Sequence, residues 1–421
     1  MLNTSFSPWP CYTQEEAEAV KRVLLSNRVN YWTGNECREF EKEFADWSGS
    51  KYAVALANGT LALDLALKVL GIGPGDDVIV TPRTYIASVS CVVNAGANPV
   101  FADVDVDSGN LSAIGIEQAL TSRTRAVICV HLAGLPCDMD PIMDLAQKYG
   151  FKVIEDCAQA HGARYKGRGV GSIGHVGAWS FCQDKIMSTG GEGGMVTTND
   201  EDLWRFMWSY KDHGKSYEAC FNRIHPPGFR WLHESFGTNW RMTELQAVIG
   251  RIQLRRMSAW TIQRQKNANM LSLALLPYSG PRGPIRISTK ACSGCNLSNN
   301  ACNEQTFPNH CVFANYKFYT YVRNENLVNG WSRDRIIEEI NKEGVPCYQG
   351  SCSEVYLEKA FEGTAWRPTR PLKVARELGE TSIMFLVHPS LKTDEMQKTC
   401  EVAAQVLNQA SGGICTQVAH H

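Results

Sequence analysis

Short apolar runs alternate with amphipathic stretches from about residue 50 to residue 260. Strand-like runs such as "KYAVALA", "DDVIVTP", "TRAVICVHLAG" and "FKVIEDCAQA" are separated by helical segments such as "GTLALDLALKVLGI" and "MDPIMDLAQKYG". Strands and helices that alternate at this spacing form βαβ units, in which helices cover both faces of a mostly parallel sheet. The pattern therefore predicts an α/β fold for this part of the chain.

A long helical pattern, "NWRMTELQAVIGRIQLRRMSAWTIQRQKNANMLSLAL", follows and predicts a link to a second domain. Beyond it, "YKFYTYVR" and "SIMFLVHPSL" read as strands, and "SRDRIIEEINKEG" and "KTDEMQKTCEVAAQVLNQ" read as helices. We expect a large α/β domain over residues 1–260, with an N-terminal arm at 1–30, and a smaller α+β domain over 261–421. Residues 278–311, rich in Gly, Pro, Ser, Asn and Cys, are expected to be a loop insertion.

Composition excludes several classes of function. The 421 residues carry a net charge of −1 without a long basic or acidic block, so nucleic acid and membrane surfaces are not expected as partners. No run approaches 18 apolar residues, and the N-terminus lacks the pattern of a secretory signal. Most of the 16 cysteines stand singly in apolar runs, which favours reduced thiols in a cytoplasmic enzyme.

The first candidate for chemistry is "VIEDCAQAHGA", in which a strand pattern ends at Glu155 and Asp156. A buried carboxylate is costly unless it meets a positive group, and the protonated ring nitrogen of pyridoxal 5'-phosphate (PLP) would be one. An ordinary helix-capping aspartate explains the segment about equally well. His161, in the same segment, is more often a core histidine than a general base.

Two further segments have simple explanations when each is taken alone. Gly59 and Thr60 follow a strand and open a helix, where free backbone amides can hold a phosphate, although a plain turn has the same pattern. In "WSFCQDKIMSTGGEGG", Ser180 precedes Lys185, and a lone lysine is usually a solvated charge. Together, however, a phosphate cradle, an acidic strand end and a lysine in a glycine-rich loop are what a PLP enzyme requires.

The ordered segments "NGTLALDLAL", "GIGPGDDVIVTPRTYIAS", "VFADVD", "VHLAGLPCDMD", "IEDCAQAHGA", "SFCQDKIMSTGGEGGM" and "GTNWRMTELQA" identify a family resemblance. The chain resembles the DegT/DnrJ/EryC1/StrS sugar aminotransferases, a branch of the fold-type I aspartate aminotransferase superfamily. The resemblance covers most of the chain. It implies a large domain with a mostly parallel seven-stranded sheet flanked by helices, plus a smaller α+β domain.

The resemblance also implies roles for single residues. Lys185 matches the Schiff-base lysine that shuttles protons, Asp156 the partner of the pyridine nitrogen, and Gln159 a side chain near the phenolic oxygen of the ring. Tyr85 matches an aromatic residue that stacks on the cofactor. The matched phosphate contacts are those of Gly59, Thr60, Ser180 and, across a homodimer with shared active sites, Asn239.

The implied reaction moves an amino group, usually from L-glutamate, to a keto group of a nucleotide-linked sugar. Two alternatives stay open. One is a related sugar dehydratase, but known variants of that type carry histidine where this chain has Lys185. The other is a non-catalytic PLP-binding regulatory protein, which the intact set of Asp156, Gln159 and Lys185 disfavours.

Two features depart from the family pattern or lie at its margin. Cys292, Cys295, Cys302 and Cys311 give C-x2-C-x6-C-x8-C in the insertion, which could hold a structural Zn²⁺, while free thiols are the more common explanation. An iron–sulfur cluster is a weaker alternative. The segment "GKSY" at 214–217 is a candidate contact to substrate phosphates.

Overall fold

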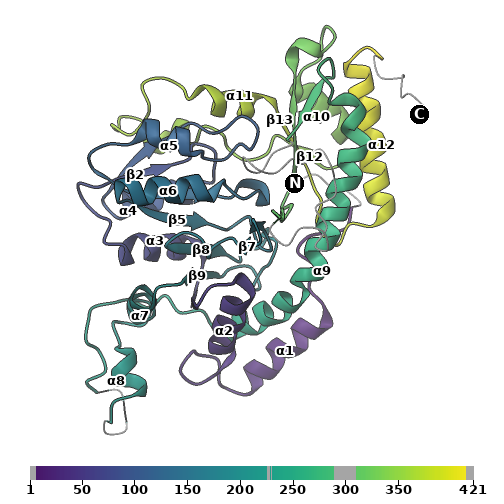
Figure 1. Cartoon of the computed structure of the whole chain (residues 1–421). Helices are drawn as coiled ribbons and strands as arrows, with labels where there is room; N and C mark the ends of the chain where they lie inside the picture. The colour runs from purple at the N-terminus through teal and green to yellow at the C-terminus, as the bar shows by residue number, and fades with distance from the viewer. Residues whose placement is uncertain (1–5, 225–227, 229, 289–309, 414–421) are drawn as a thin grey trace.

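The computed structural model describes residues 6–224, 228, 230–288 and 310–413 (Figure 1). Its large sheet has seven strands in the order β1-β9-β8-β5-β4-β2-β3. The pairs β2–β3, β2–β4, β4–β5 and β5–β8 are parallel, and β9 is antiparallel to both of its neighbours. The strands are β1 Tyr52–Leu56, β2 Asp77–Val80, β3 Asn98–Phe101, β4 Thr124–Val130, β5 Lys152–Asp156, β8 Val176–Ser180 and β9 Gly194–Thr198.

Helices cover both faces of this sheet. One face packs against α3 (Gly59–Val69), α4 (Ala87–Asn94) and α7 (Glu201–Tyr210). The other packs against α2 (Glu36–Ser48), α6 (Met139–Tyr149) and the first half of α9 (Glu244–Leu275). The predicted mostly parallel, helix-flanked sheet is therefore confirmed, because strands buried on both faces carry the continuous apolar runs seen in the sequence.

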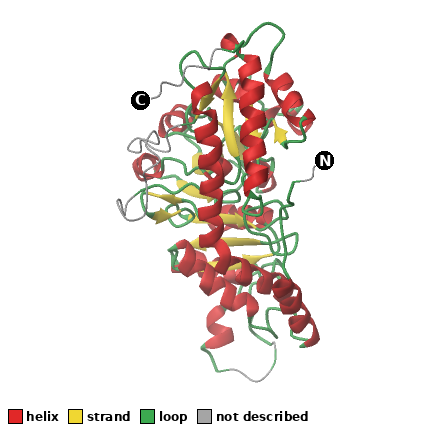
Figure 2. Cartoon of the chain, turned by 90° about the vertical axis from the view of Figure 1, so that its right-hand side faces the viewer, coloured by secondary structure: helices red, strands yellow, loops and turns green. Residues whose placement is uncertain are grey.

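A second, four-stranded antiparallel sheet has the order β10-β11-β13-β12. Its strands are β10 Ile285–Ile287, β11 Phe318–Val322, β12 Cys347–Tyr348 and β13 Ser382–Phe385. Helices α10 (Arg333–Lys342) and α12 (Thr393–Ala410) share an apolar core with this sheet and the second half of α9. Figure 2 shows α9 and α12 as long neighbouring helices. Because α9 runs through residue 260, the boundary at that residue stays a prediction.

The expected loop insertion at 278–311 contains a strand in its described part, and residues 289–309 lie outside the described residues, so the insertion stays a prediction. β10 lies inside that range and pairs with β11, so the start of the segment belongs to the small sheet. A run of three residues is too short to show a strand period, so the hydrophobic pattern did not predict β10. The remaining elements are α1 Gln14–Leu25, η1 Leu132–Gly134, α5 Ala113–Ala119, β6 Arg164–Tyr165, β7 Arg168–Gly169, α8 Tyr217–Phe221, η2 Leu276–Tyr278, η3 Asn324–Asn326, η4 Val355–Leu357, η5 Lys359–Phe361 and α11 Lys373–Thr381.

None of the helices within the described ranges combines the length and the apolar character that a membrane span needs.

Candidate active site

The carboxyl ends of β5 and β8 lie side by side at one edge of the large sheet. Asp156, the last residue of β5, pairs with Ala178 of β8, and Ser180 follows two residues later. Side chains alternate across a strand, so Ser180 lies on the same face as Ala178, the face covered by α3 and α4. Two sequence-predicted residues, Asp156 and Ser180, therefore meet at the edge where parallel sheets bind ligands.

Helix α3 begins directly against Ser180. A Cβ added to Gly59 would lie 2.5 Å from the Ser180 Cβ, and one added to Gly194 would collide with the Asn58 carbonyl. The Asn58 side chain caps the helix by accepting from the Leu61 amide at 3.0 Å. The amides of Gly59 and Thr60 belong to the first turn, whose N–H groups have no partner within the helix. This corner therefore offers amides, a hydroxyl and a positive dipole end to an anion.

Asp156 is buried, with 5 % of its surface exposed. Its Oδ2 accepts a hydrogen bond from the Ser88 hydroxyl at 2.7 Å, and its Oδ1 accepts from the Ala158 amide at 3.1 Å. Thr84 lies 2.8 Å from the same Ser88 hydroxyl. No cation is paired with Asp156 among the described residues, so the charge of this buried carboxylate is not yet matched by a positive partner.

Lys185 lies in the loop between β8 and β9, with 16 % of its side chain accessible. Its Nζ is 3.8 Å from Asp184 Oδ1 and 5.6 Å from the centre of the Tyr316 ring. The Tyr316 hydroxyl donates to Asp184 Oδ2 at 2.6 Å. Burial alone would raise the pKa of Asp184, but Lys185 and Tyr316 hold it below the usual value. The lysine is thus held between a carboxylate and an aromatic ring.

Gln159 lies in the segment after β5 and connects that segment to the turn after β4. Its Oε1 accepts from the Ala133 amide at 2.8 Å, and the Ala133 carbonyl accepts from the Tyr316 amide at 2.9 Å. Ala133 has a φ of 57°, a left-handed conformation that non-glycine residues rarely adopt. Sequence reasoning missed Ala133 and Tyr316, since neither carries a recognisable chemical signal in its own segment.

Two predicted residues lie at the outer side of the site. Tyr85 precedes α4 and leaves 71 % of its surface exposed, so its ring is open to a ligand. Asn239 is also exposed, and its backbone forms a bridge with Asp212. The backbone carbonyl of its neighbour Trp240 accepts a hydrogen bond from the Ala57 amide at 3.0 Å, close to the start of α3.

His161 lies in the core behind the site. It is fully buried, with its ring 5.2 Å from that of Trp179 and 5.6 Å from that of Phe181. Neither ring nitrogen has a partner among the described residues. Burial, followed by the charges of Lys185 and Arg264, lowers the pKa of His161 to about 3. The ring is therefore neutral at physiological pH, in the surroundings of a core histidine.

Two weaker predictions, the phosphate contact and the zinc site, stay predictions. Lys215 of the "GKSY" segment is buried and bonded to Asp212 Oδ1 at 3.0 Å, an oxygen that Arg241 also contacts. The expected contact of this segment with substrate phosphates stays a prediction. Of the four candidate zinc ligands, Cys311 is buried beside the Lys166 amide. Cys292, Cys295 and Cys302 lie outside the described residues.

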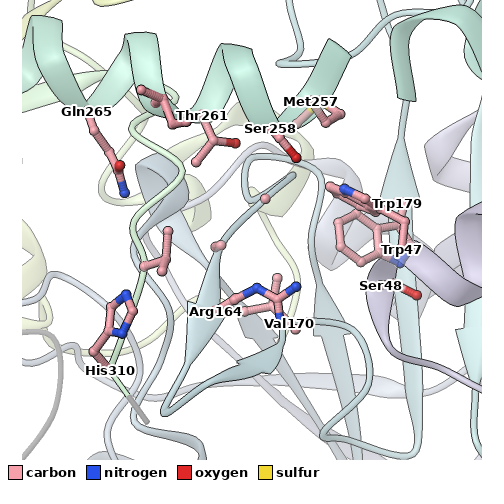
Figure 3. Close-up of a pocket in the computed structure, with 15 residues that line it drawn as sticks. Trp47, Ser48, Arg164, Val170, Trp179, Met257, Ser258, Thr261, Gln265 and His310 are labelled. Atoms are coloured by element: carbon pink, nitrogen blue, oxygen red, sulfur yellow. The ribbon is translucent and has the colours of Figure 1, made fainter. Parts of the chain in front are cut away.

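A cavity of about 550 Å³ lies apart from these residues, between α9 and the β6–β7 hairpin (Figure 3). Thr261 and Gln265 of α9 line one side, and Arg164 and His310 line the other. Its lining includes neither Lys185 nor Asp156, and Trp179, which does line it, points away from the face that holds Ser180. The cavity is therefore separate from the candidate site.

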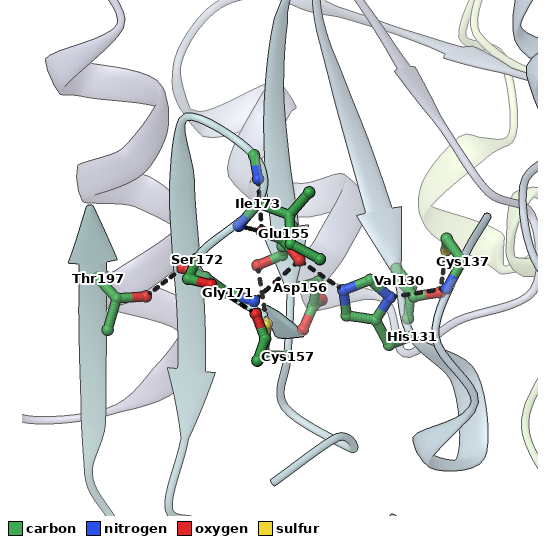
Figure 4. A network of polar contacts seen from close by, with 12 residues as sticks. Val130, His131, Cys137, Glu155, Asp156, Cys157, Gly171, Ser172, Ile173 and Thr197 are labelled. Atoms are coloured by element: carbon green, nitrogen blue, oxygen red, sulfur yellow. Dashed lines mark hydrogen bonds and ion pairs between the residues drawn. The ribbon is translucent and has the colours of Figure 1, made fainter. Parts of the chain in front are cut away.

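Glu155 is the other carboxylate at the end of β5, and it is part of a closed network (Figure 4). It accepts from the Gly171, Ile173 and Gly174 amides at 2.8, 2.8 and 2.6 Å, and its Oε2 is 3.0 Å from His131 Nε2. These bonds fix the turn that leads into β8. Glu155 therefore positions the strand and is turned away from the site.

Comparison with known proteins agrees with this geometry. The DegT/DnrJ/EryC1/StrS aminotransferase family matches residues 10–404. A crystal structure of an aminotransferase from Psychrobacter cryohalolentis is 60% identical, with a TM-score of 0.90 over 96% of this chain and 99% of that one. The GDP-perosamine synthase of Caulobacter vibrioides is 34% identical over 88% of this chain and 89% of its own length.

A third relative is the UDP-N-acetyl-3-dehydro-alpha-D-glucosamine 3-aminotransferase of Acidithiobacillus ferrooxidans, 46% identical over 57% of this chain and 62% of its own. The fold and the site define a fold-type I, PLP-dependent aminotransferase. The chain belongs to the DegT/DnrJ/EryC1/StrS aminotransferase family.

The described residues fit this cofactor. No cation in the described part of the chain is paired with the buried Asp156 carboxylate, which suits a partner for a protonated ring nitrogen. The contact between Gly59 and Ser180 leaves no space for a Cβ, while the first amides of α3 and the Ser180 hydroxyl suit a phosphate. Both sets of groups lie at the same edge of the sheet, at the ends of neighbouring strands.

Proposed function

We propose that this enzyme transfers an amino group from L-glutamate to a keto group of a nucleotide-linked sugar. The observation that carries the proposal is the meeting of Asp156, Ser180 and the start of α3 beside the loop that bears Lys185. The sugar substrate is supported by the names of the relatives, which act on nucleotide-linked sugars. Amino-sugar and polysaccharide biosynthesis is the corresponding metabolic role.

The cofactor supplies an aldehyde and an electron-accepting ring. In our proposal Lys185 would hold the cofactor covalently through its amine, with the aldehyde oxygen leaving as water, and the amine, once free again, would carry a proton between the two reacting carbons. Asp156 keeps the ring nitrogen protonated, because a buried carboxylate without another cation stabilises a positive charge in contact with it. Ser88 and the Ala158 amide hold that carboxylate in place.

The remaining site residues bind and orient. Gly59, Thr60 and Ser180 hold the phosphate, and Tyr85 covers one face of the ring by stacking. Gln159, fixed through its Oε1 by the Ala133 amide, keeps its amide NH₂ available for the phenolic oxygen of the ring. Asp184, bonded to Tyr316, keeps a negative charge 3.8 Å from the Lys185 amine before the cofactor binds.

We also propose a homodimer in which Asn239 reaches the cofactor phosphate of the second copy. Exposed apolar side chains support this arrangement. Ile224, Trp231 and Phe236 are 100%, 85% and 99% exposed. They follow α8 in the sequence, and α8 projects away from the sheet (Figure 1). Contact with a second copy would bury these exposed apolar side chains.

The visible spectrum of the PLP-loaded enzyme tests the function. L-Glutamate should bleach the absorption of the lysine-bound cofactor, and a nucleotide-linked ketosugar should restore it, with the mass change of an amine replacing a ketone. Lys185→Ala should bind the cofactor without either change. A cofactor that glutamate never converts would contradict the transaminase, and loss of a sugar hydroxyl without gain of nitrogen would indicate the dehydratase.

A further inference from the structure

The N-terminal arm, described from Phe6 onward, connects the small domain to the loop that bears Lys185. The Ser7 amide and hydroxyl donate to Glu395 Oε1 at 2.6 and 3.1 Å, at the start of α12. The Pro8 carbonyl accepts from the Ser390 hydroxyl at 2.7 Å. The arm is thus anchored on the small domain immediately before it reaches Trp9.

Trp9 is held by aromatic and cationic side chains. Its ring stacks on His388 at 5.9 Å with an interplanar angle of 23°, and it meets the Trp260 ring edge-on at 5.1 Å. The Arg264 guanidinium carbon lies 5.0 Å from the centre of the ring. Contacts from α9 and from the segment after β13 therefore fix the plane of the indole and the direction of its N–H group.

That N–H group donates to the backbone carbonyl of Lys185 at 2.7 Å. Three residues further along the arm, the Tyr12 hydroxyl donates to Ser188 Oγ at 3.0 Å. The same loop is held on its other side by the bond from Tyr316 to Asp184. The backbone from which the reactive amine extends is therefore fixed between the arm and the segment that leads into β11.

We propose that Trp9 is a positioning residue for Lys185, and that the arm makes the placement of the reactive amine depend on the docking of the small domain. The inference rests on the proposed covalent role of Lys185. A lysine that must reach two reacting carbons needs a fixed backbone origin, since a displacement of about 1 Å can lower a rate by roughly 10²-fold. Simple packing of the ring needs no N–H donor, so the hydrogen bond distinguishes positioning from packing.

Trp9→Phe removes the donor and keeps an aromatic ring, and Trp260→Phe is the matched control, because it alters the same aromatic contact without touching the Lys185 carbonyl. In the PLP-loaded full chain, we expect Trp9→Phe to lower kcat roughly tenfold with little change in the KM for glutamate, as loss of one part-buried hydrogen bond that orients the loop would. Trp260→Phe should leave kcat within about twofold, and the thermal midpoints of the two variants should agree.

A second measurement requires no amino transfer. Borohydride reduction traps the cofactor on Lys185, and we expect Trp9→Phe to slow this covalent attachment while Trp260→Phe does not. Equal attachment rates and equal kcat in the two variants would overturn the inference. If the wild-type enzyme attached the cofactor but never accepted nitrogen from glutamate, the proposed function would fail, whereas the role of Trp9 would still be decided by attachment.

Discussion

Glu155 and Asp156 are neighbours at the end of one strand, and both are buried, yet their surroundings differ. Glu155 accepts hydrogen bonds from three backbone amides and from His131. Asp156 accepts from one hydroxyl and one amide and meets no cation among the described residues. The alternation of side chains along β5 places the two carboxylates on opposite faces of the sheet.

The pKa of Glu155 is lowered because its carboxylate accepts several hydrogen bonds. Burial alone would raise it, but the bond from His131 and the Gly171 and Gly174 amides lower it below the usual value. The Cys137 amide donates to His131 Nδ1 at 3.0 Å, so the proton of the ring sits on Nε2 and is donated to Glu155. The Cys157 thiol donates to the Glu155 carbonyl oxygen at 3.7 Å. The side chains of His131, Glu155 and Cys157, which lie close enough together to hold a metal ion, are therefore all engaged in hydrogen bonds.

The difference shows how a functional carboxylate can be recognised. A buried carboxylate whose oxygens all accept hydrogen bonds from the protein holds the backbone in place. A buried carboxylate that can accept further hydrogen bonds at the ligand-binding edge of the sheet is available for chemistry.

The substitution with the largest expected effect on activity is Asp156→Asn. We expect the rate of amino transfer from glutamate to fall by roughly 10²- to 10⁴-fold, which is the usual contribution of a side chain positioned to control a proton. Single-turnover absorption measures this rate.

The urea midpoint of Asp156→Asn should stay close to that of the wild type, because the variant keeps the shape of the side chain. Activity within tenfold of the wild type would remove Asp156 from the mechanism.

Glu155→Gln should show the opposite pattern. Its amide NH₂ would face backbone N–H donors, and burying a donor without an acceptor costs about 3 kcal/mol of unfolding free energy. Urea unfolding of the cofactor-free and cofactor-loaded protein measures this loss. A variant as stable as the wild type, with reduced activity, would reverse the roles assigned to the two carboxylates.

His161 is a third kind of buried polar residue. Its ring nitrogens have no hydrogen-bond partner among the described residues, and its ring lies in the core, away from any ligand. The unfolded chain binds the proton below a pH of about 6.5, whereas the folded ring does so only near its pKa of about 3. Its contribution to stability is therefore complete above pH 6.5 and is lost as the pH falls toward 3. Between pH 6.5 and 5 the loss is about 2 kcal/mol.

His161→Phe should flatten the pH dependence of unfolding over that interval by the same amount, whatever its effect at pH 8. Denaturant unfolding at four or five pH values measures the slope. An unchanged slope would show that the ring takes up a proton in the folded protein.

The smallest expected effect is that of Ser88→Ala. Loss of the 2.7 Å hydrogen bond should loosen Asp156 and cost about 1 kcal/mol, a fall in kcat of roughly fivefold. Ser88→Thr keeps a hydroxyl and should recover part of the loss. Equal rates for the wild type and Ser88→Ala would show that the Ala158 amide alone fixes the carboxylate.

Much of the fold could be predicted because its strands are buried on both faces and are separated by amphipathic helices. β10 could not be predicted, because a strand of three residues is too short to show the alternation of apolar and polar positions. Asp156 and Lys185 stood out through their motifs, but the difference between Glu155 and Asp156 depends on the turn at 171–174, which approaches only in three dimensions. The alternation of β5 was the available signal, because it predicts opposite faces for two adjacent carboxylates.

Contacts between distant segments were beyond sequence reasoning. Trp9 lies 176 positions before Lys185, and nothing in the N-terminal segment indicates that its indole reaches that carbonyl. Tyr316 meets Asp184 in a similar way, through docking of the segment before β11 onto the turn after β4. Such pairs are set by domain packing, which a local pattern does not encode.

The continuity of α9 has a consequence for protein engineering. Its 32 residues span about 48 Å, and its two halves supply side chains to the cores of the large and the small sheet in turn. A chimera that exchanges the small domain with that of a relative, in order to alter sugar preference, would divide this helix if it were cut near residue 260. A crossover before the cap at Thr243 or after Leu275 would transfer the helix whole.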